Sequence, residues 1–161
     1  MANKSAIAIF AHPDDIEFRA AGTLMLLREA GFDIHCMNVA NGNCGSLTHS
    51  SATIAAIRAK EAQAAAEILG ATWHPSIASD LEITYDIGLI RQITAVMREV
   101  NPSIVLTHAL DDYMEDHMFT SRLAVTAAFS KGIPNFLSEP PRDRASGNVT
   151  IYHAMPHGLH D

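Results

Sequence analysis

The sequence predicts an α/β fold with a Rossmann-like, mostly parallel sheet and helices on both faces. Two observations support this prediction. Short apolar runs of strand length alternate along the chain with longer stretches that carry apolar residues at helical spacing. Glycine or proline stands at many of the boundaries between these segments, where helices and strands commonly end. Regular alternation of strands and helices is typical of parallel sheets covered by helices on both sides.

The first strand is predicted over residues 6–10, because this apolar run is too short for a helix and the chain turns at Pro13. A helix is expected over residues 19–30, where Leu and Ala recur at helical spacing and Gly31 stands at the position of a C-cap. The apolar run over residues 33–40 predicts the second strand.

A glycine-rich loop at residues 41–46 leads into a long, alanine-rich helix over residues 51–69. A Ser or Thr caps this helix at its start, and Gly70 closes it. A weak third strand is expected over residues 71–77. The third helix covers residues 86–100 and ends before a proline, because a residue that precedes proline disfavours helical backbone.

The same patterns predict a fourth strand over residues 103–107, a fourth helix over residues 118–131 and a last strand over residues 148–153. The proline-rich stretch 140–144 connects the last helix to the last strand and is the only linker-like segment of the sequence. We therefore expect a single domain over residues 1–161.

Composition excludes several classes of function. The net charge of −7 argues against a nucleic-acid partner, because the chain has no basic stripe to neutralise phosphates. The sequence shows no signal peptide and no apolar stretch long enough to span a bilayer, so we expect a cytoplasmic protein. Its two cysteines fit neither a CxxC pair nor a disulfide framework.

The most informative segment directly follows the first predicted strand. His12, Asp14, Asp15 and Glu17 place an imidazole and three carboxylates within six positions. The tips of buried parallel strands are where polar chemistry is displayed, and this ligand set suits zinc or another divalent transition metal. The segment predicts a metal-assisted hydrolase.

A second polar cluster follows the fourth predicted strand. In the common order of a doubly wound sheet, the first and fourth strands are neighbours, so the loops after both meet over one crevice. The two clusters should therefore form one site although about a hundred residues separate them. The members of the second cluster are His108, Asp111, Asp112, Glu115, Asp116 and His117.

Three side chains from the two clusters, His12, Asp15 and His117, supply the ligands of a catalytic zinc site with an open position for water. Asp14 would take a proton from that water as general base, and Asp116 would orient a ligating imidazole. The alternative is that both clusters are solvated turns, since acidic loops at strand ends are common.

The chain resembles the zinc-dependent N-deacetylases that include N-acetylglucosaminyl-phosphatidylinositol de-N-acetylase (PIG-L) and the bacterial LmbE-like proteins. The resemblance rests on the run Ala-His-Pro-Asp-Asp at residues 11–15, with an acid two places later and Gly-Thr-Leu at residues 22–24. It extends to the glycine-containing loop at 41–45, to Arg-x-x-Glu at 58–61 and to Asp80. The resemblance covers nearly the whole chain.

Carried over by position, the resemblance implies that His12, Asp15 and His117 hold one zinc ion per chain and that Asp14 is the base. It further implies that Arg58 and Asp80 contact the substrate. Arg58 could equally be a helix-surface residue paired with Glu61. The expected reaction removes an acyl group, acetyl above all, from an N-acetylated amino sugar or a related small molecule.

The chain departs from the family pattern in two respects. The family's second motif is usually His-Pro-Asp-His, whereas this chain has Met114 at the first position, and methionine cannot donate a hydrogen bond to the substrate oxygen. Losing such a donor typically costs about 100- to 1,000-fold in rate. Family members also generally continue further, so we expect a C-terminally truncated domain. The candidate replacements for the missing donor are His108, Tyr113, His153, His157 and His160, of which His157 is favoured.

Two alternatives stay open at this point. One is an amidase that acts on a thiol-sugar conjugate with the same machinery. The other is a metal- or ligand-binding protein in which Met114 has weakened catalysis. We further expect a small-molecule substrate and a homo-oligomer, because the family commonly assembles.

Overall fold

The computed structural model describes residues 4–156 and contains a five-stranded sheet in which every neighbouring pair is parallel. The strand order is β3-β2-β1-β4-β5. The strands are β1 (Ser5–Phe10), β2 (Asp33–Asn38), β3 (Ala71–His74), β4 (Ile104–Thr107) and β5 (Thr150–His153). This arrangement confirms the predicted fold class and the predicted pairing of the first and fourth strands.

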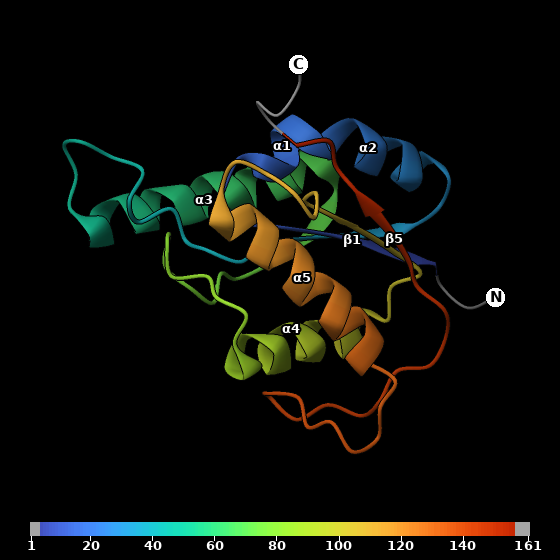
Figure 1. Cartoon of the computed structure of the whole chain (residues 1–161). Helices are drawn as coiled ribbons and strands as arrows, with labels where there is room; N and C mark the ends of the chain where they lie inside the picture. Colours follow the sequence, from blue (N-terminus) through green and yellow to red (C-terminus); the bar gives the residue numbers. More distant parts are fainter. Residues whose placement is uncertain (1–3, 157–161) are drawn as a thin grey trace.

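Helices cover both faces of the sheet (Figure 1). On one face, Ile7 and Ile9 of β1 pack in a core with α4 (Ile87–Val100) and α5 (Glu115–Ser130). On the other, alternate residues of β1 that include Phe10 pack with the remaining helices. These are α1 (Asp15–Arg19), α2 (Ala21–Glu29) and α3 (Ser51–Leu69). Every residue of β1 is buried, as expected for the central strand of a parallel sheet.

Local caps explain why two of the helices begin and end as predicted. The Ser50 hydroxyl accepts a hydrogen bond from the Thr53 amide at the start of α3, and Gly70 ends that helix with φ of 66°. Asp86 caps α4 by accepting from the amides of Gly88 and Leu89. A side-chain acceptor at the N-cap satisfies amides that have no partner within the helix, and glycine adopts positive φ without strain.

Two predicted helix boundaries are wrong. The helix predicted from residue 19 begins at Ala21, because the backbone breaks at Ala20, whose φ is −129°, and a separate short helix, α1, precedes it from Asp15. The helix predicted from residue 118 begins at Glu115 instead. Glu115 and Asp116 lie in its first turn, where negative side chains interact favourably with the helix dipole. The strands predicted over 33–40, 71–77 and 148–153 are each shorter in the structure.

The topology brings the ends of β1 and β4 together. Ala6 pairs with Ile104 and Ile9 with Thr107, so the segments that leave the two strands emerge side by side at the carboxyl edge of the sheet. Ligand sites of open α/β sheets lie at such switch points. Within residues 4–156, we find no helix with the length and apolar character that a membrane span requires.

Candidate metal centre and active site

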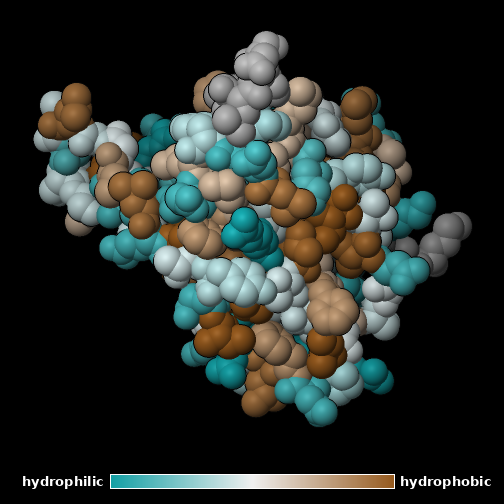
Figure 2. Space-filling view, in the orientation of Figure 1, coloured by the Kyte–Doolittle hydropathy of each residue, from teal (hydrophilic) through white to brown (hydrophobic). Residues whose placement is uncertain are grey.

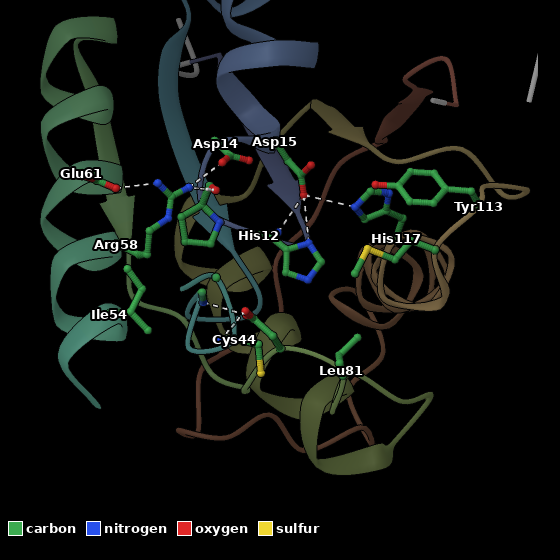
Figure 3. A pocket seen from close by; sticks show the side chains of 15 residues that line it. His12, Asp14, Asp15, Cys44, Ile54, Arg58, Glu61, Leu81, Tyr113 and His117 are labelled. Atoms are coloured by element: carbon green, nitrogen blue, oxygen red, sulfur yellow. Dashed lines mark hydrogen bonds and ion pairs between the residues drawn. The ribbon is translucent and has the colours of Figure 1, made fainter. Parts of the chain in front are cut away.

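His12, Asp15 and His117 meet at this edge. One ligand atom from each lies within 4.8 Å of the others, and the three residues range from half-buried to buried. Asp15 Oδ2 stands between the imidazoles, 3.5 Å from His12 Nδ1 and 3.6 Å from His117 Nε2. Figure 3 shows these side chains converging from the end of β1 and the start of α5. The structure therefore brings together the three residues that the sequence assigned to a metal.

A buried carboxylate holds the outer nitrogen of each imidazole. His12 Nε2 lies 2.9 Å from Asp116 Oδ2, which also accepts a hydrogen bond from the Leu81 amide. His117 Nδ1 lies 3.0 Å from Asp112 Oδ1. This pattern leaves His12 Nδ1 and His117 Nε2 facing Asp15. Carboxylates placed in this way orient metal-ligating histidines and fix their tautomers.

The charge balance at His12 reflects the same surroundings. Burial lowers the pKa of His12, but the hydrogen bonds to Asp15 and Asp116 more than offset this, and its pKa rises to about 9 in the metal-free protein. Two imidazole nitrogens, each on a ring that a carboxylate holds, and one carboxylate oxygen are a donor set that fits a divalent transition metal.

Asp14 stands beside the cluster at the start of α1. Its backbone has a φ of 97°, a left-handed conformation that non-glycine residues rarely adopt. Its side chain is about half exposed and forms an ion pair of 2.6 Å with Arg58 Nη2. Burial raises the pKa of Asp14, and the Arg58 guanidinium opposes that rise. A carboxylate with a raised pKa is suited to taking and returning a proton.

Arg58 lies on α3 and connects several parts of the site. It donates to the carbonyl of Pro13 and to Asp14, and its Nη1 pairs with Glu61 at 2.6 Å. Gly42 makes room for it, since a Cβ there would lie 2.8 Å from Arg58 Cγ. The predicted contact with Glu61 is present, and the guanidinium also braces the turn that carries Asp14. Contact between Arg58 and a substrate stays a prediction.

Asp80 supports the glycine-rich loop. Its two carboxylate oxygens accept hydrogen bonds from the amides of Gly42, at 2.7 Å, and Cys44, at 2.9 Å. In return, the Asp80 amide donates to Asn43 Oδ1. Asp80 borders the same cleft as His12, Asp15 and His117. Its carboxylate oxygens already have hydrogen-bond partners in the loop, and its contact with a substrate stays a prediction.

The cluster forms one wall of a cleft of about 520 Å³. Another part of the wall is apolar and consists of Ile54, Leu81, Tyr113 and Met114. Figure 3 shows Tyr113 beside His117, with its hydroxyl directed toward the side chains of His117 and Asp15. The two rings meet edge to face, with centroids 5.5 Å apart. Leu81 has a φ of 64°, the conformation in which its amide reaches Asp116.

The late histidines fall elsewhere. His153 Nδ1 hydrogen-bonds to the His108 carbonyl at 2.7 Å and is not among the residues that line the cleft. His157 and His160 lie outside the described residues, so the favoured role of His157 as oxyanion donor stays a prediction. From the sequence, Asp112 and His108 were members of the second polar cluster, and His108 was also a candidate donor, but neither was assigned a role in holding a metal-ligating histidine. Their signal was position alone, directly after the fourth strand.

A family model described as PIG-L, GlcNAc-PI de-N-acetylase, matches residues 7–128. The chain belongs to this family. Among curated PIG-L relatives, a 4-oxalmesaconate hydratase from Pseudomonas putida is 30% identical over 162 residues, which cover 96% of this chain and 62% of that protein. A diacetylchitobiose deacetylase from Thermococcus kodakarensis is 30% identical over 141 residues, which cover 83% of this chain and 52% of that protein. The chain thus spans less than two thirds of either relative.

Solved structures agree with the family assignment. The N,N'-diacetylchitobiose deacetylase from Pyrococcus horikoshii superposes with a TM-score of 0.86 at 25% identity and covers 97% of this chain and 62% of its own. The 4-carboxy-2-hydroxymuconate hydratase from Pseudomonas putida superposes with a TM-score of 0.83 at 30% identity, over 93% of this chain and 65% of its own. The relatives of this chain therefore include deacetylases and a hydratase, and those with solved structures share one fold.

Proposed function

We propose that this PIG-L family member is a metal-dependent hydrolase that removes an acetyl or related acyl group from an N-acetylated amino sugar or similar small molecule. The observation that carries the proposal is the convergence of His12, Asp15 and His117 within 4.8 Å beside Asp14, in a cleft open to a ligand. The deacetylases among its relatives support the same reaction class.

The donor set suits one zinc ion per chain. His12 Nδ1, an oxygen of Asp15 and His117 Nε2 would hold the ion, and Asp116 would keep the imidazole of His12 in the required tautomer. When bound, such an ion activates water near neutral pH and polarises an acyl oxygen.

Asp14 carries the proton in this mechanism. It accepts a proton from the attacking water as the water oxygen bonds to the acyl carbon, and it returns that proton to the amine nitrogen as the C–N bond breaks. The immediate products are a carboxylic acid and a free amine, and the acid then gives up its proton, so that the products near neutral pH are a carboxylate and an ammonium ion. Arg58 keeps Asp14 at the edge of the cleft through its ion pair and its bond to the Pro13 carbonyl.

Tyr113 is the donor that best replaces the histidine missing at Met114. Its hydroxyl is directed toward the metal cluster, and its side chain is exposed to the cleft. His108 is fully buried and His153 is bonded to a backbone carbonyl, so among the described candidates Tyr113 is the one that can meet a substrate oxygen. A phenol donates one hydrogen bond, as the oxyanion requires.

Hydration of an unsaturated acid is a second candidate, favoured by the 30% identity to a hydratase over 96% of this chain. The charges of the cleft argue against it. Carboxylates outnumber the single guanidinium, Arg58, which is already paired with Asp14 and Glu61. A cleft of this charge suits a neutral amide and an amine product better than a carboxylated muconate. The carboxylates that line it are Asp14, Asp15, Glu61 and Asp80.

The test combines metal content with turnover. We expect about one zinc per chain in the wild type by elemental analysis, and its loss in His117→Ala. Acetate release from N-acetylglucosamine derivatives should be abolished by Asp14→Asn, which keeps the metal, and kept by Glu17→Gln, a neighbouring acid that does not line the cleft.

Three outcomes would overturn the proposal. Hydration of a carboxylated muconate without acetate release would assign the hydratase reaction. Cleavage of thiol-sugar amides alone would assign the amidase alternative. Metal binding without turnover on any of these substrates, even in Met114→His, would assign a binding protein.

Self-association is also part of the proposal. Several large apolar side chains are exposed, among them Phe129 and Tyr152, and Figure 2 shows apolar areas on the side of the molecule that α5 faces. Apolar areas of this kind favour association. Light scattering after size-exclusion chromatography will give the mass; a monomer at micromolar concentration would contradict this expectation.

A further inference from the structure

His108 is a buried imidazole to which the proposed mechanism gives no role. It follows β4 directly and is 0% exposed. Its ring stacks on that of the metal-site residue His117, with centroids 4.0 Å apart and planes 7° apart, and it meets Phe10 edge to face. The His108 carbonyl accepts a hydrogen bond from His153, which ties it to β5. His108 is therefore held on several sides and in turn supports one face of His117.

Asp112 is the second buried group beneath the site. Its Oδ1 lies 3.0 Å from His117 Nδ1, and its side chain is fully buried. Within residues 4–156, Asp112 Oδ2 and His108 Nδ1 are two of the few buried side-chain polar atoms that have no hydrogen-bond partner. A buried carboxylate needs donors, because an unpaired charge away from water is costly. His117 Nδ1–H is the one that Asp112 has at hydrogen-bond distance.

These residues do not form a second metal centre, although one nitrogen of each ring and one Asp112 oxygen lie within 4.8 Å of one another. The lone pair of an imidazole nitrogen lies in the plane of its ring. The rings of His108 and His117 are almost parallel and face each other at 4.0 Å, so their lone pairs do not converge on a point between them. A hydrogen-bonded support fits this geometry, and shared coordination does not.

The tautomer of His108 follows from its contacts. Nε2 lies 2.9 Å from the Ala11 amide nitrogen and 3.3 Å from Asp15 Oδ2. It can accept from the amide or donate to the carboxylate, but it cannot do both. The amide contact is shorter, and the Ala11 N–H has a fixed direction. If Nε2 accepts from the Ala11 amide, the proton of neutral His108 lies on Nδ1. Nδ1 has no hydrogen-bond partner among the described residues.

We infer that Asp112 and His108 are positioning residues of this site. Asp112 holds the proton of His117 on Nδ1, so that Nε2 keeps its lone pair for a metal. His108 fixes the plane of the His117 ring by stacking on it. His108 also anchors the backbone at Ala11, next to His12. The metal-binding consequence rests on the proposed function. The tautomer consequence does not, because it concerns the metal-free chain.

The first experiment is long-range ¹H–¹⁵N NMR of the histidine rings in the metal-free protein. We expect both His117 and His108 to carry their proton on Nδ1 in the wild type. Asp112→Asn keeps the size of the side chain and lets its amide donate to His117 Nδ1, so His117 should shift toward the Nε2–H tautomer. Asp111→Asn is the matched control, since it makes the same change at the exposed neighbour.

The second experiment measures zinc affinity of the same variants by competition with a chromophoric chelator. Asp112→Asn should weaken binding about 10- to 100-fold, while Asp111→Asn leaves it unchanged. A wild-type His117 protonated on Nε2, or an Asp112→Asn variant with the wild-type tautomer and affinity, would overturn the inference and leave the proposed function standing. A wild type that binds no zinc would overturn the proposed function, and the tautomer comparison would still decide the role of Asp112.

Discussion

Replacing Gly42 by alanine tests how the glycine-rich loop and Arg58 fit together. Gly42 has a φ of 77°, and a Cβ at this position would lie 2.8 Å from Arg58 Cγ and 3.0 Å from Arg58 Cβ. The atoms it would meet are the stem of Arg58, whose far end holds Asp14 and the Pro13 carbonyl. The substitution should therefore strain the loop and displace the side chain that braces Asp14.

Two terms set the magnitude. An alanine in the left-handed region costs about 1–2 kcal/mol. Crowding a packed side chain adds about 1–3 kcal/mol, while the partly exposed ion pair to Asp14 contributes at most about 1 kcal/mol. We expect Gly42→Ala to lower the free energy of unfolding by about 2–5 kcal/mol, the sum of the backbone and crowding terms. For a chain of this size, each kcal/mol lowers the melting temperature by about 2–4 °C.

Two other glycines separate these terms. Gly31 has a φ of 85° with no atom within 4 Å of an added Cβ, so Gly31→Ala reports the backbone term alone, about 1–2 kcal/mol. Gly22 lies in α2 with the same open space, and Gly22→Ala should stabilise by about 0.5–1 kcal/mol. Urea unfolding of all three variants measures the differences. If Gly42→Ala costs no more than Gly31→Ala, Arg58 does not fill the space we assign to it.

Three further predictions concern other parts of the molecule. Burial lowers the pKa of His74, which lies 3.0 Å from His35, to about 4, below its unfolded value. Because the unfolded chain takes up a proton on His74 before the folded chain does, the free energy of unfolding falls by on the order of 3 kcal/mol as the pH drops from 6.5 toward 4. The free energy of unfolding of His74→Gln should therefore depend less on pH over that range. The same pH dependence in the wild type and the variant would contradict this prediction. The Arg98 guanidinium is buried and donates to backbone carbonyls of the segment after α5. Arg98→Lys should therefore lower the free energy of unfolding in urea by about 3 kcal/mol. A loss below about 1 kcal/mol would show that these hydrogen bonds do not hold the segment in place. Tyr113→Phe should lower kcat about 100- to 1,000-fold with zinc content unchanged, and adding Met114→His should recover part of the loss; an unchanged kcat would exclude Tyr113 as donor.

The sequence was sufficient to predict the sheet and the meeting of the two polar clusters. His12 follows a buried strand, and His117 belongs to a cluster that follows a later strand. A doubly wound strand order brings the ends of these two strands to the same edge of the sheet, so the meeting of the clusters follows from the order of strands and helices alone. The register of β1 against β4 is the physical link that the prediction needed.

Local structure around the site was harder to predict. The short helix α1 begins at Asp15, after a proline and after Asp14, whose backbone is left-handed and whose carboxylate pairs with Arg58 from another helix. The contact of Asp14 with Arg58 joins residues 44 positions apart in the chain, so no local pattern reveals it. Asp80 shows the same limit. A carboxylate after the third strand reads as a ligand for substrate, but only the folded chain reveals that loop amides occupy its oxygens.

The earlier start of α5 explains how two adjacent residues serve different sides of the site. Successive side chains on an α-helix point about 100° apart. Because the helix already includes Asp116 and His117, Asp116 turns toward His12 while His117 turns toward Asp15 and Asp112. A loop, as the sequence suggested, would leave both directions free to vary. The first turn of α5 thus fixes the proposed ligand His117 together with Asp116, the carboxylate that holds His12. The proposed metal site therefore needs the helix to begin before this pair of residues and not after it.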